Sequence, residues 1–201
     1  MTRRFVSFGR ALSVDTVADW CDLARRAPSA GFSQGVHFLV RSDVTDTLDA
    51  LGSLEWWTAR HPGVVDASAV VVVLADPSAY TDRYGRPDKA GRGLEEEPGW
   101  RVPYWIADAG MVVQNLLLIA ESDSRGALFA GVFRDPSAAL ISWGVPSGVE
   151  CIGLVFVGER HPDDRPSGSG VSRRRRRTID VVHRDTWGSV PPSFPPGRDE
   201  P

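Results

Sequence analysis

The sequence of 201 residues has only two cysteines, Cys21 and Cys151, and no apolar run long enough to cross a membrane. Each cysteine lies within an apolar pattern, which is typical of reduced, buried thiols rather than of a disulfide. The first residues also lack the apolar core of a secretion signal. We therefore expect a cytoplasmic protein with no membrane partner.

Several catalytic signatures are missing as well. The four histidines lie far apart in the chain and do not have the spacing of metal ligands. There is no GxSxG elbow, no Walker loop and no complete GxGxxG. The residues therefore predict no metal site and no hydrolase or kinase chemistry. An enzyme whose cofactor carries out the reaction remains compatible with this sequence.

The charge balance is nearly even, with 23 basic and 26 acidic residues and a formal net charge of −3. Such a balance gives no general attraction to nucleic acid. Five consecutive arginines at 173–177 could by themselves indicate a nucleic-acid or acidic-membrane patch. The negative net charge and the lack of aromatics within the run disfavour that interpretation. A solvated linker stays open, and we expect no nucleic-acid partner.

The length and the 42% hydrophobic content favour one domain with a sizeable core. Hydrophobic periodicity predicts helices and strands in alternation along the chain. The expected helices span about 13–27, 43–60, 105–122 and 136–143, and the expected strands about 36–41, 68–75, 127–133 and 151–157. A tail rich in Pro and Gly follows from 188 to 201.

The segment from Arg25 to Val40 joins a helix to a strand through small residues. Pro28 disfavours the helical region for the preceding residue and removes a backbone donor. The Ser-Ala-Gly run that follows leaves backbone groups open to a flat ligand at close range. An ordinary helix-to-strand loop explains the same residues.

Residues 79–103 have weak periodicity and many glycines and prolines, yet they are rich in aromatics. A segment of this kind is either disordered or a working lid, and the aromatics favour the lid. We expect Tyr84, Trp100 and Tyr104 to contact a small-molecule substrate.

Four short motifs together resemble the FMN-dependent nitroreductase family over roughly residues 3–187. Ala27 to Val36 is similar to the family's APSAGNSQPW segment, and Asp108 to Leu118 to its DAG…QNLLL helix. Gly144-Val145-Pro146 resembles its GIP, and Val181-Val182-His183 its VVH. The resemblance implies an α+β, nitroreductase-like fold with a central mixed β-sheet flanked by helices, assembled as an interlocked homodimer. Residues 1–187 would form the FMN-binding domain.

The resemblance also implies the site. The chemistry would occur on FMN, with no catalytic side chain, and NAD(P)H would donate the electrons. The implied cofactor-binding residues are Arg3, Arg4, Pro28, Ser29, Ala30, Gln34, Asn115, Ala130, Gly131, Arg175 and Arg176. Of these, Arg175 and Arg176 match the basic pair that grips the FMN phosphate, where an arginine can pair two oxygens at once.

The implied function is the reduction of a small acceptor such as a nitroaromatic or a quinone. Phe32 departs from the family's usual asparagine, and a Gly-Phe pair also occurs in the flavin-fragmenting synthase that makes dimethylbenzimidazole. Oxygen-using flavin chemistry is therefore one alternative, and a flavin-binding protein without turnover is another. The apolar surface of helix 105–122 exceeds what one sheet face can cover, so we expect Val112 or Leu116 to face a partner subunit.

Overall fold

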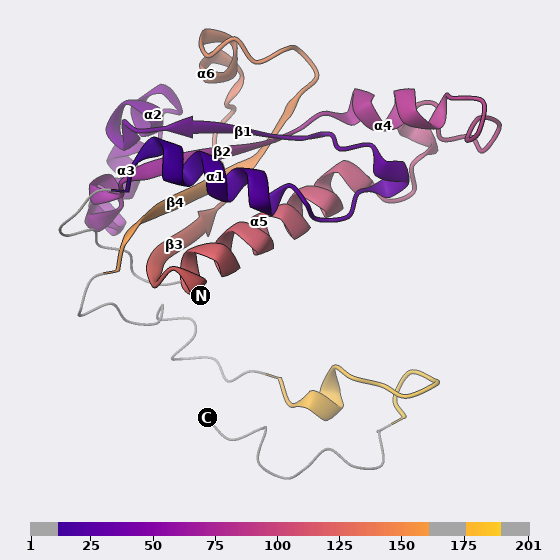
Figure 1. Cartoon of the computed structure of the whole chain (residues 1–201). Coiled ribbons are helices and arrows are strands. Elements are labelled where there is room, and N and C mark those ends of the chain that lie inside the picture. The colour runs from indigo at the N-terminus through magenta and orange to yellow at the C-terminus, as the bar shows by residue number, and fades with distance from the viewer. Residues whose placement is uncertain (1–11, 161–175, 190–201) are drawn as a thin grey trace. The chain divides into compact units, whose positions relative to one another are not determined.

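The computed structural model describes residues 12–160 and 176–189. The chain divides into two compact units, Met1–Arg165 and Pro166–Pro201. The sheet and the α-helices belong to the first unit (Figure 1). The described residues of the second unit contain the short 3-10 turn η4, Thr178–Asp180. The expected division into a domain at 1–187 and a tail stays a prediction.

The core of the first unit is a four-stranded sheet in the order β1-β2-β4-β3. Its strands are β1 Val36–Arg41, β2 Ala69–Ala75, β3 Arg125–Ala130 and β4 Glu150–Glu159. Helices flank the sheet, so the expected α+β class is confirmed. The sheet was expected to be mixed, but among the described strands all three pairings are antiparallel. β1 and β4 run in one direction and β2 and β3 in the other, and the order β1-β2-β4-β3 alternates the two directions.

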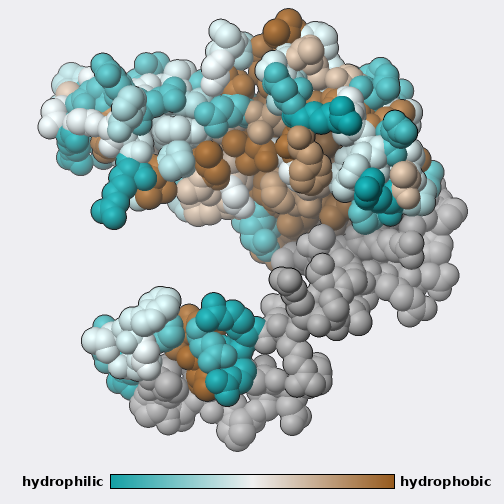
Figure 2. Space-filling view, turned by 180° about the vertical axis from the view of Figure 1, so that it is seen from behind, coloured by the Kyte–Doolittle hydropathy of each residue, from teal (hydrophilic) through white to brown (hydrophobic). Residues whose placement is uncertain are grey.

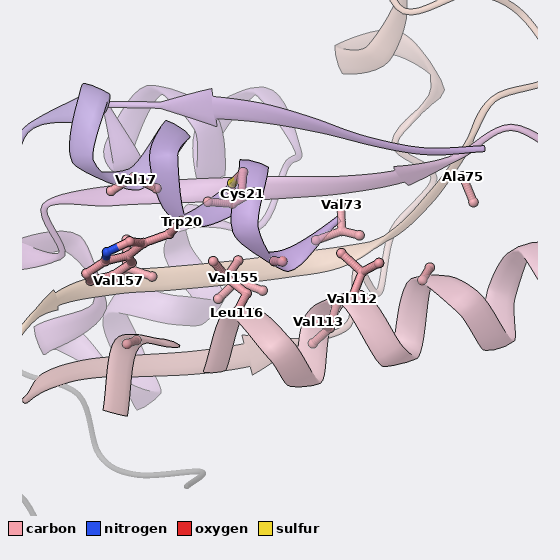
Figure 3. Packing of buried hydrophobic residues seen from close by; sticks show 14 of the residues in the cluster. Val17, Trp20, Cys21, Val73, Ala75, Val112, Val113, Leu116, Val155 and Val157 are labelled. Atoms are coloured by element: carbon pink, nitrogen blue, oxygen red, sulfur yellow. The ribbon is translucent and has the colours of Figure 1, made fainter. Parts of the chain in front are cut away.

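Helices α1, Val14–Ala24, and α5, Tyr104–Ser122, cover one face of the sheet (Figure 1). The Ser13 hydroxyl begins α1 as expected, because it accepts a hydrogen bond from the Thr16 amide. Figure 3 shows Val17, Trp20 and Cys21 of α1 pointing into the layer between the sheet and α5. Burial raises the pKa of the Cys21 thiol to about 12, and both cysteines are free thiols, as predicted.

The opposite face is covered by α2 Val44–Ala50, α3 Leu54–Arg60 and α6 Ser137–Ser142, with the 3-10 turn η2 Pro62–Asp66. The prediction of one helix over 43–60 is wrong. Gly52 lies in the left-handed region at φ +60°, where the chain turns between α2 and α3. The seven residues of β2 are all buried between the two layers, as their apolar run predicted.

A helix inside 79–103 was not predicted, yet α4 spans Pro77–Tyr84. The Asp76 carboxylate caps its N-terminus by accepting from the Ser78 amide, and Pro77 occupies the first helical position. Farther on, the 3-10 turn η3 is Glu97–Gly99. Among the described residues, no helix is both long and apolar enough to cross a bilayer.

Candidate functional site

Two cavities meet at the loop between α1 and β1. The first, the loop cavity, has a volume of about 170 Å³ and is lined by Arg25, Ala27, Pro28, Ser29, Gln34, Val36, His37, Asp108 and Val112. The second, the arginine cavity, has a volume of about 350 Å³ and is lined by Gly31, Phe32, Ser33, Gln34, Ala79, Arg83 and Arg86. Gln34 lines both, so the two cavities are neighbours.

The loop that separates them has an unusual backbone. It contains the 3-10 turn η1, Ala30–Phe32, and Gly31, Phe32 and Gln34 have φ angles of +60°, +59° and +55°. A left-handed conformation is rare for a bulky residue such as phenylalanine and costs free energy. Strain of this kind persists only where the surroundings hold the backbone in place.

Hydrogen bonds within the loop supply part of that restraint. The Ser29 hydroxyl accepts from the Gln34 amide at 3.1 Å, and the Ser33 hydroxyl donates to the Ala30 carbonyl at 2.6 Å. The side-chain amide of Gln34 is exposed, and among the described residues it makes no hydrogen bond. It is therefore available to a ligand in either cavity.

Asp108 of α5 is the central contact of the site. Its side chain is only 3% exposed, and one carboxylate oxygen accepts from both the Ala30 amide and the Tyr80 hydroxyl, each at 2.9 Å. These bonds join the loop and α4 to the central helix. Burial, followed by the hydrogen bond and the charge of Asp108, raises the pKa of Tyr80 far above its ordinary value. The Tyr80 hydroxyl therefore keeps its proton and remains a donor.

Helix α4 holds the other side of the loop (Figure 1). The Arg83 guanidinium donates to the Gly31 carbonyl at 2.8 Å and forms a two-pronged ion pair with Asp88. The ring of Tyr84 approaches Gly31 so closely that a β-carbon there would lie 2.8 Å from it. Gly31 is therefore required both for its positive φ and for this close approach.

The structure brings together four of the predicted cofactor-binding residues. Pro28, Ser29 and Gln34 line the loop cavity, and Ala30 donates its amide to Asp108. Asn115 lies outside the lining of both cavities, and its side-chain amide donates to the Ala24 carbonyl at 3.2 Å. The Ala24 carbonyl at the end of α1 also accepts from the Ala27 amide at 3.2 Å, and the Asn115 bond joins it to α5.

Two further predicted residues of the first unit, Ala130 and Gly131, are not brought to these cavities. Ala130 ends β3 and Gly131 follows it, and neither lines the loop cavity or the arginine cavity. Arg3, Arg4 and Arg175 lie outside the described residues. Arg176 belongs to the second unit, where its guanidinium donates to the Asp180 carbonyl at 3.2 Å. Their roles toward a cofactor stay predictions.

The three residues predicted to contact substrate form part of an aromatic cluster. Trp100 is only 8% exposed, and its ring meets the rings of Tyr84 and Tyr104 edge to face at 4.8 and 5.8 Å. Tyr80 and Trp105 pack against the same tryptophan. Trp100 is therefore packed within the first unit, whereas Tyr104 is 45% exposed.

Sequence reasoning missed Asp108, Arg83 and His37 as site residues. Asp108 had one available signal, because it is the only charged residue between Tyr104 and Ala120 of an otherwise apolar helix. A carboxylate at such a position requires hydrogen-bond donors. Among the described residues, no cluster of His, Cys, Asp or Glu could hold a metal ion.

Comparison with known proteins supports the resemblance predicted from the sequence. The chain is 26% identical over 183 residues to a protein of Archaeoglobus fulgidus named "Putative NADH dehydrogenase/NAD(P)H nitroreductase", covering 89% of each chain. No family model matches the sequence.

Solved structures establish the fold. A nitroreductase-like protein of Streptococcus mutans has a TM-score of 0.68 at 19% identity, with 91% of this chain and 93% of that chain covered. Nitroreductase CinD of Lactococcus lactis, solved in complex with chloramphenicol, has a TM-score of 0.70 at 15% identity, with 92% and 95% covered. A nitroreductase family protein of Streptococcus pneumoniae has a TM-score of 0.65 at 16% identity, with 92% and 95% covered. The chain has the nitroreductase fold.

Proposed function

We propose that this chain is an FMN-dependent oxidoreductase that uses NAD(P)H to reduce a small acceptor such as a nitroaromatic or a quinone. The observation that carries the proposal is the loop cavity, built from the residues that resemble the flavin segment of the nitroreductase family. The relative in Archaeoglobus fulgidus, whose name includes an NAD(P)H nitroreductase, supports the same reaction class.

The residues around the loop cavity fit a flavin. The ring edge of a flavin carries both an N–H donor and carbonyl acceptors, so it needs partners of both kinds. The Gln34 amide can both donate and accept, and Ser29 lies on the same wall. The small residues Ala27 and Pro28 leave the backbone accessible to a flat ring.

When bound, FMN would supply the electron transfer between the nicotinamide and the acceptor. The chain's own residues would position it. Asp108 and Arg83 hold the loop at Ala30 and Gly31, and the side chain of Gln34 on that loop would bind the ring edge. Val36 and Val112 line the cavity and would give the ring an apolar wall. The arginines of 173–177 would bind the phosphate.

A homodimer in the cytoplasm is part of this proposal. The described residues give the loop cavity a volume below the roughly 300–1,000 Å³ of a typical cofactor site, and a second copy would supply further walls. Ile106, Met111 and Leu118 of α5 are exposed apolar residues that a second copy would cover. On the side of the first unit that lies behind the view of Figure 1, Figure 2 shows a further group of hydrophobic residues, in brown, across the middle.

The first expected outcome concerns the cofactor. The purified protein should be yellow and should release FMN, not FAD, on denaturation, since a single terminal phosphate suits the proposed arginines. Chromatography of the released flavin provides the measurement. A colourless protein that also fails to take up added FMN would contradict the proposal.

Turnover distinguishes the alternatives. Steady oxidation of NAD(P)H that depends on an added nitroaromatic or quinone under anaerobic conditions would support the reductase. Consumption of oxygen with loss of the flavin would favour the flavin-fragmenting chemistry suggested by Gly31-Phe32. Bound flavin without either activity would make the chain a flavin-binding protein.

A second expected outcome concerns the arginine run. Replacing Arg175 and Arg176 together by alanine should weaken FMN binding about tenfold or more, because a charge-assisted hydrogen bond contributes about 1.5–3 kcal/mol. The melting temperature of the flavin-free protein should change little. Arg184→Ala is the matched control, since Arg184 is an exposed arginine of the same unit paired with Asp185. Unchanged FMN affinity in the double variant would make the run a solvated linker.

A further inference from the structure

The arginine cavity has a consistent electrostatic character. Two arginines, Arg83 and Arg86, line it, and none of its lining residues is acidic. Gln34 lines this cavity and the loop cavity alike, so a molecule in one lies beside a flavin bound in the other. The polar and cationic lining is unsuited to a purely apolar molecule.

The two arginines differ in their partners. Asp88 accepts from both terminal nitrogens of Arg83 at 2.8 and 2.9 Å, and the Gly31 carbonyl accepts from the third. The charge of Arg83 is therefore neutralised by Asp88, and its guanidinium holds the loop at Gly31. Among the described residues, no hydrogen bond or ion pair engages the exposed side chain of Arg86. Its five N–H donors and its charge are available to a ligand.

Phe32 adds a flat surface to the same cavity. Its side chain is 76% exposed, although its backbone is held in the left-handed region at φ +59°. Packing among the described residues of the first unit does not explain an aromatic ring in that position. A strained, exposed residue in the wall of a cavity indicates a role in binding. An aromatic ring stacks favourably on a flat ligand.

From these observations we propose that the arginine cavity binds the anionic group of a flat aromatic reactant, with Arg86 pairing the anion and Phe32 stacking on the ring. This inference deepens the proposed function and rests on it for the identity of the reaction. The anion would be either a carboxylate on the acceptor or the 2′-phosphate of NADPH, since both present oxygens that a guanidinium can pair.

Turnover experiments separate the two sources. In the first arm, 4-nitrobenzoate is compared with its neutral analogue 4-nitrobenzamide, with NADH as donor. In the second, NADPH is compared with NADH, with 4-nitrobenzamide as acceptor. Arg86→Gln should lower about tenfold either the ratio of kcat/KM for 4-nitrobenzoate over 4-nitrobenzamide or that for NADPH over NADH, and leave the other ratio unchanged. Raising the salt concentration should lower the same ratio in the wild type.

A matched control removes an arginine elsewhere. Arg60→Gln deletes the same charge on α3, where Arg60 stacks over Trp56, and should leave both ratios as in the wild type. If Arg86→Gln leaves both ratios unchanged, or if Arg60→Gln lowers them equally, the cavity does not recognise an anion.

A binding measurement keeps this inference separate from the proposed reaction. Calorimetric titration of the full chain with 4-nitrobenzoate, and separately with adenosine 2′-phosphate, should show one of them binding at least tenfold more weakly to Arg86→Gln. That result would support the anion site even in a protein without turnover. Binding of neither probe would overturn the anion site even in an active reductase.

Discussion

Asp108→Ala should reduce the free energy of unfolding of the flavin-free protein by about 2–5 kcal/mol. The substitution leaves the Ala30 amide and the fully buried Tyr80 hydroxyl without their acceptor. The unsatisfied Tyr80 hydroxyl costs about 1–3 kcal/mol, and the hydrogen bond lost at the part-buried Ala30 amide, made to a charged group, contributes about 1.5–3 kcal/mol. For a domain of this size the melting temperature should fall by roughly 5–15 °C. FMN affinity should fall further than stability explains, because the loop that carries Gln34 loses its fixed position.

Three further variants test whether the effect comes from the hydrogen bonds of Asp108. Asp46→Ala is the control: it removes an exposed carboxylate paired with Arg41, and should lower stability by only about 0–1 kcal/mol. Asp108→Asn keeps an acceptor oxygen and should retain most of the FMN affinity. Tyr80→Phe breaks one of the two bonds and should fall between Asp108→Asn and Asp108→Ala. Stability and FMN affinity equal to the wild type in Asp108→Ala would show that this contact does not hold the loop.

Most of the secondary structure could be predicted because its causes are local. The apolar run at 68–75 predicts a strand buried on both faces, and β2 is buried along its whole length. The strand expected at 36–41 is β1, and the helix expected at 105–122 is α5, with one residue added at its start. Periodicity and capping residues determine these elements without reference to the rest of the chain.

The errors arose where a single residue or a tertiary contact determines where a helix begins or ends. Gly52 ends α2 and separates it from α3, yet the apolar spacing of leucines continues across the break. Helix α4 depends on the cap at Asp76, and its burial comes from Tyr80, which sequence reasoning placed in a lid. Periodicity is weak in so short a helix, so its cap is the better signal.

The candidate site could be predicted only in part, because tertiary contacts hold its loop in place. The order of small residues after Pro28 predicts an accessible loop, and Pro28, Ser29 and Gln34 do line a cavity. The partners that hold this loop come from positions 50 to 80 residues away, at Arg83 and Asp108. Such long-range contacts leave no periodic pattern in a single sequence.

The expectation that Val112 or Leu116 faces a partner subunit is corrected by their burial in the first unit. Val112 is 3% exposed and Leu116 is fully buried. Both belong to the core cluster that α5 forms with α1 and the sheet (Figure 3). A charge at either position would therefore unfold the chain rather than separate two chains. The exposed side of α5 instead carries Met111 and Leu118, two turns apart, at 38% and 51% exposure.

Replacing Met111 and Leu118 together by glutamate should therefore convert the proposed dimer into a folded monomer that has lost FMN. Two charges on each copy would be brought out of water at a dimer interface, at a cost of several kcal/mol per buried charge. Because a two-fold interface repeats the change on both copies, the effect doubles. Light scattering would give the mass, circular dichroism the fold, and absorbance at the flavin band the FMN content.

Ile141→Glu is the matched control, because Ile141 is 75% exposed on α6 and lies on the opposite side of the sheet from α5. This variant should remain a dimer and keep its FMN. Dimerisation and flavin binding are expected to be lost together in the α5 variant, since in the proposed function the second copy supplies further walls of the flavin site. A monomer of Met111→Glu/Leu118→Glu that retains FMN would show that one chain completes the flavin site alone.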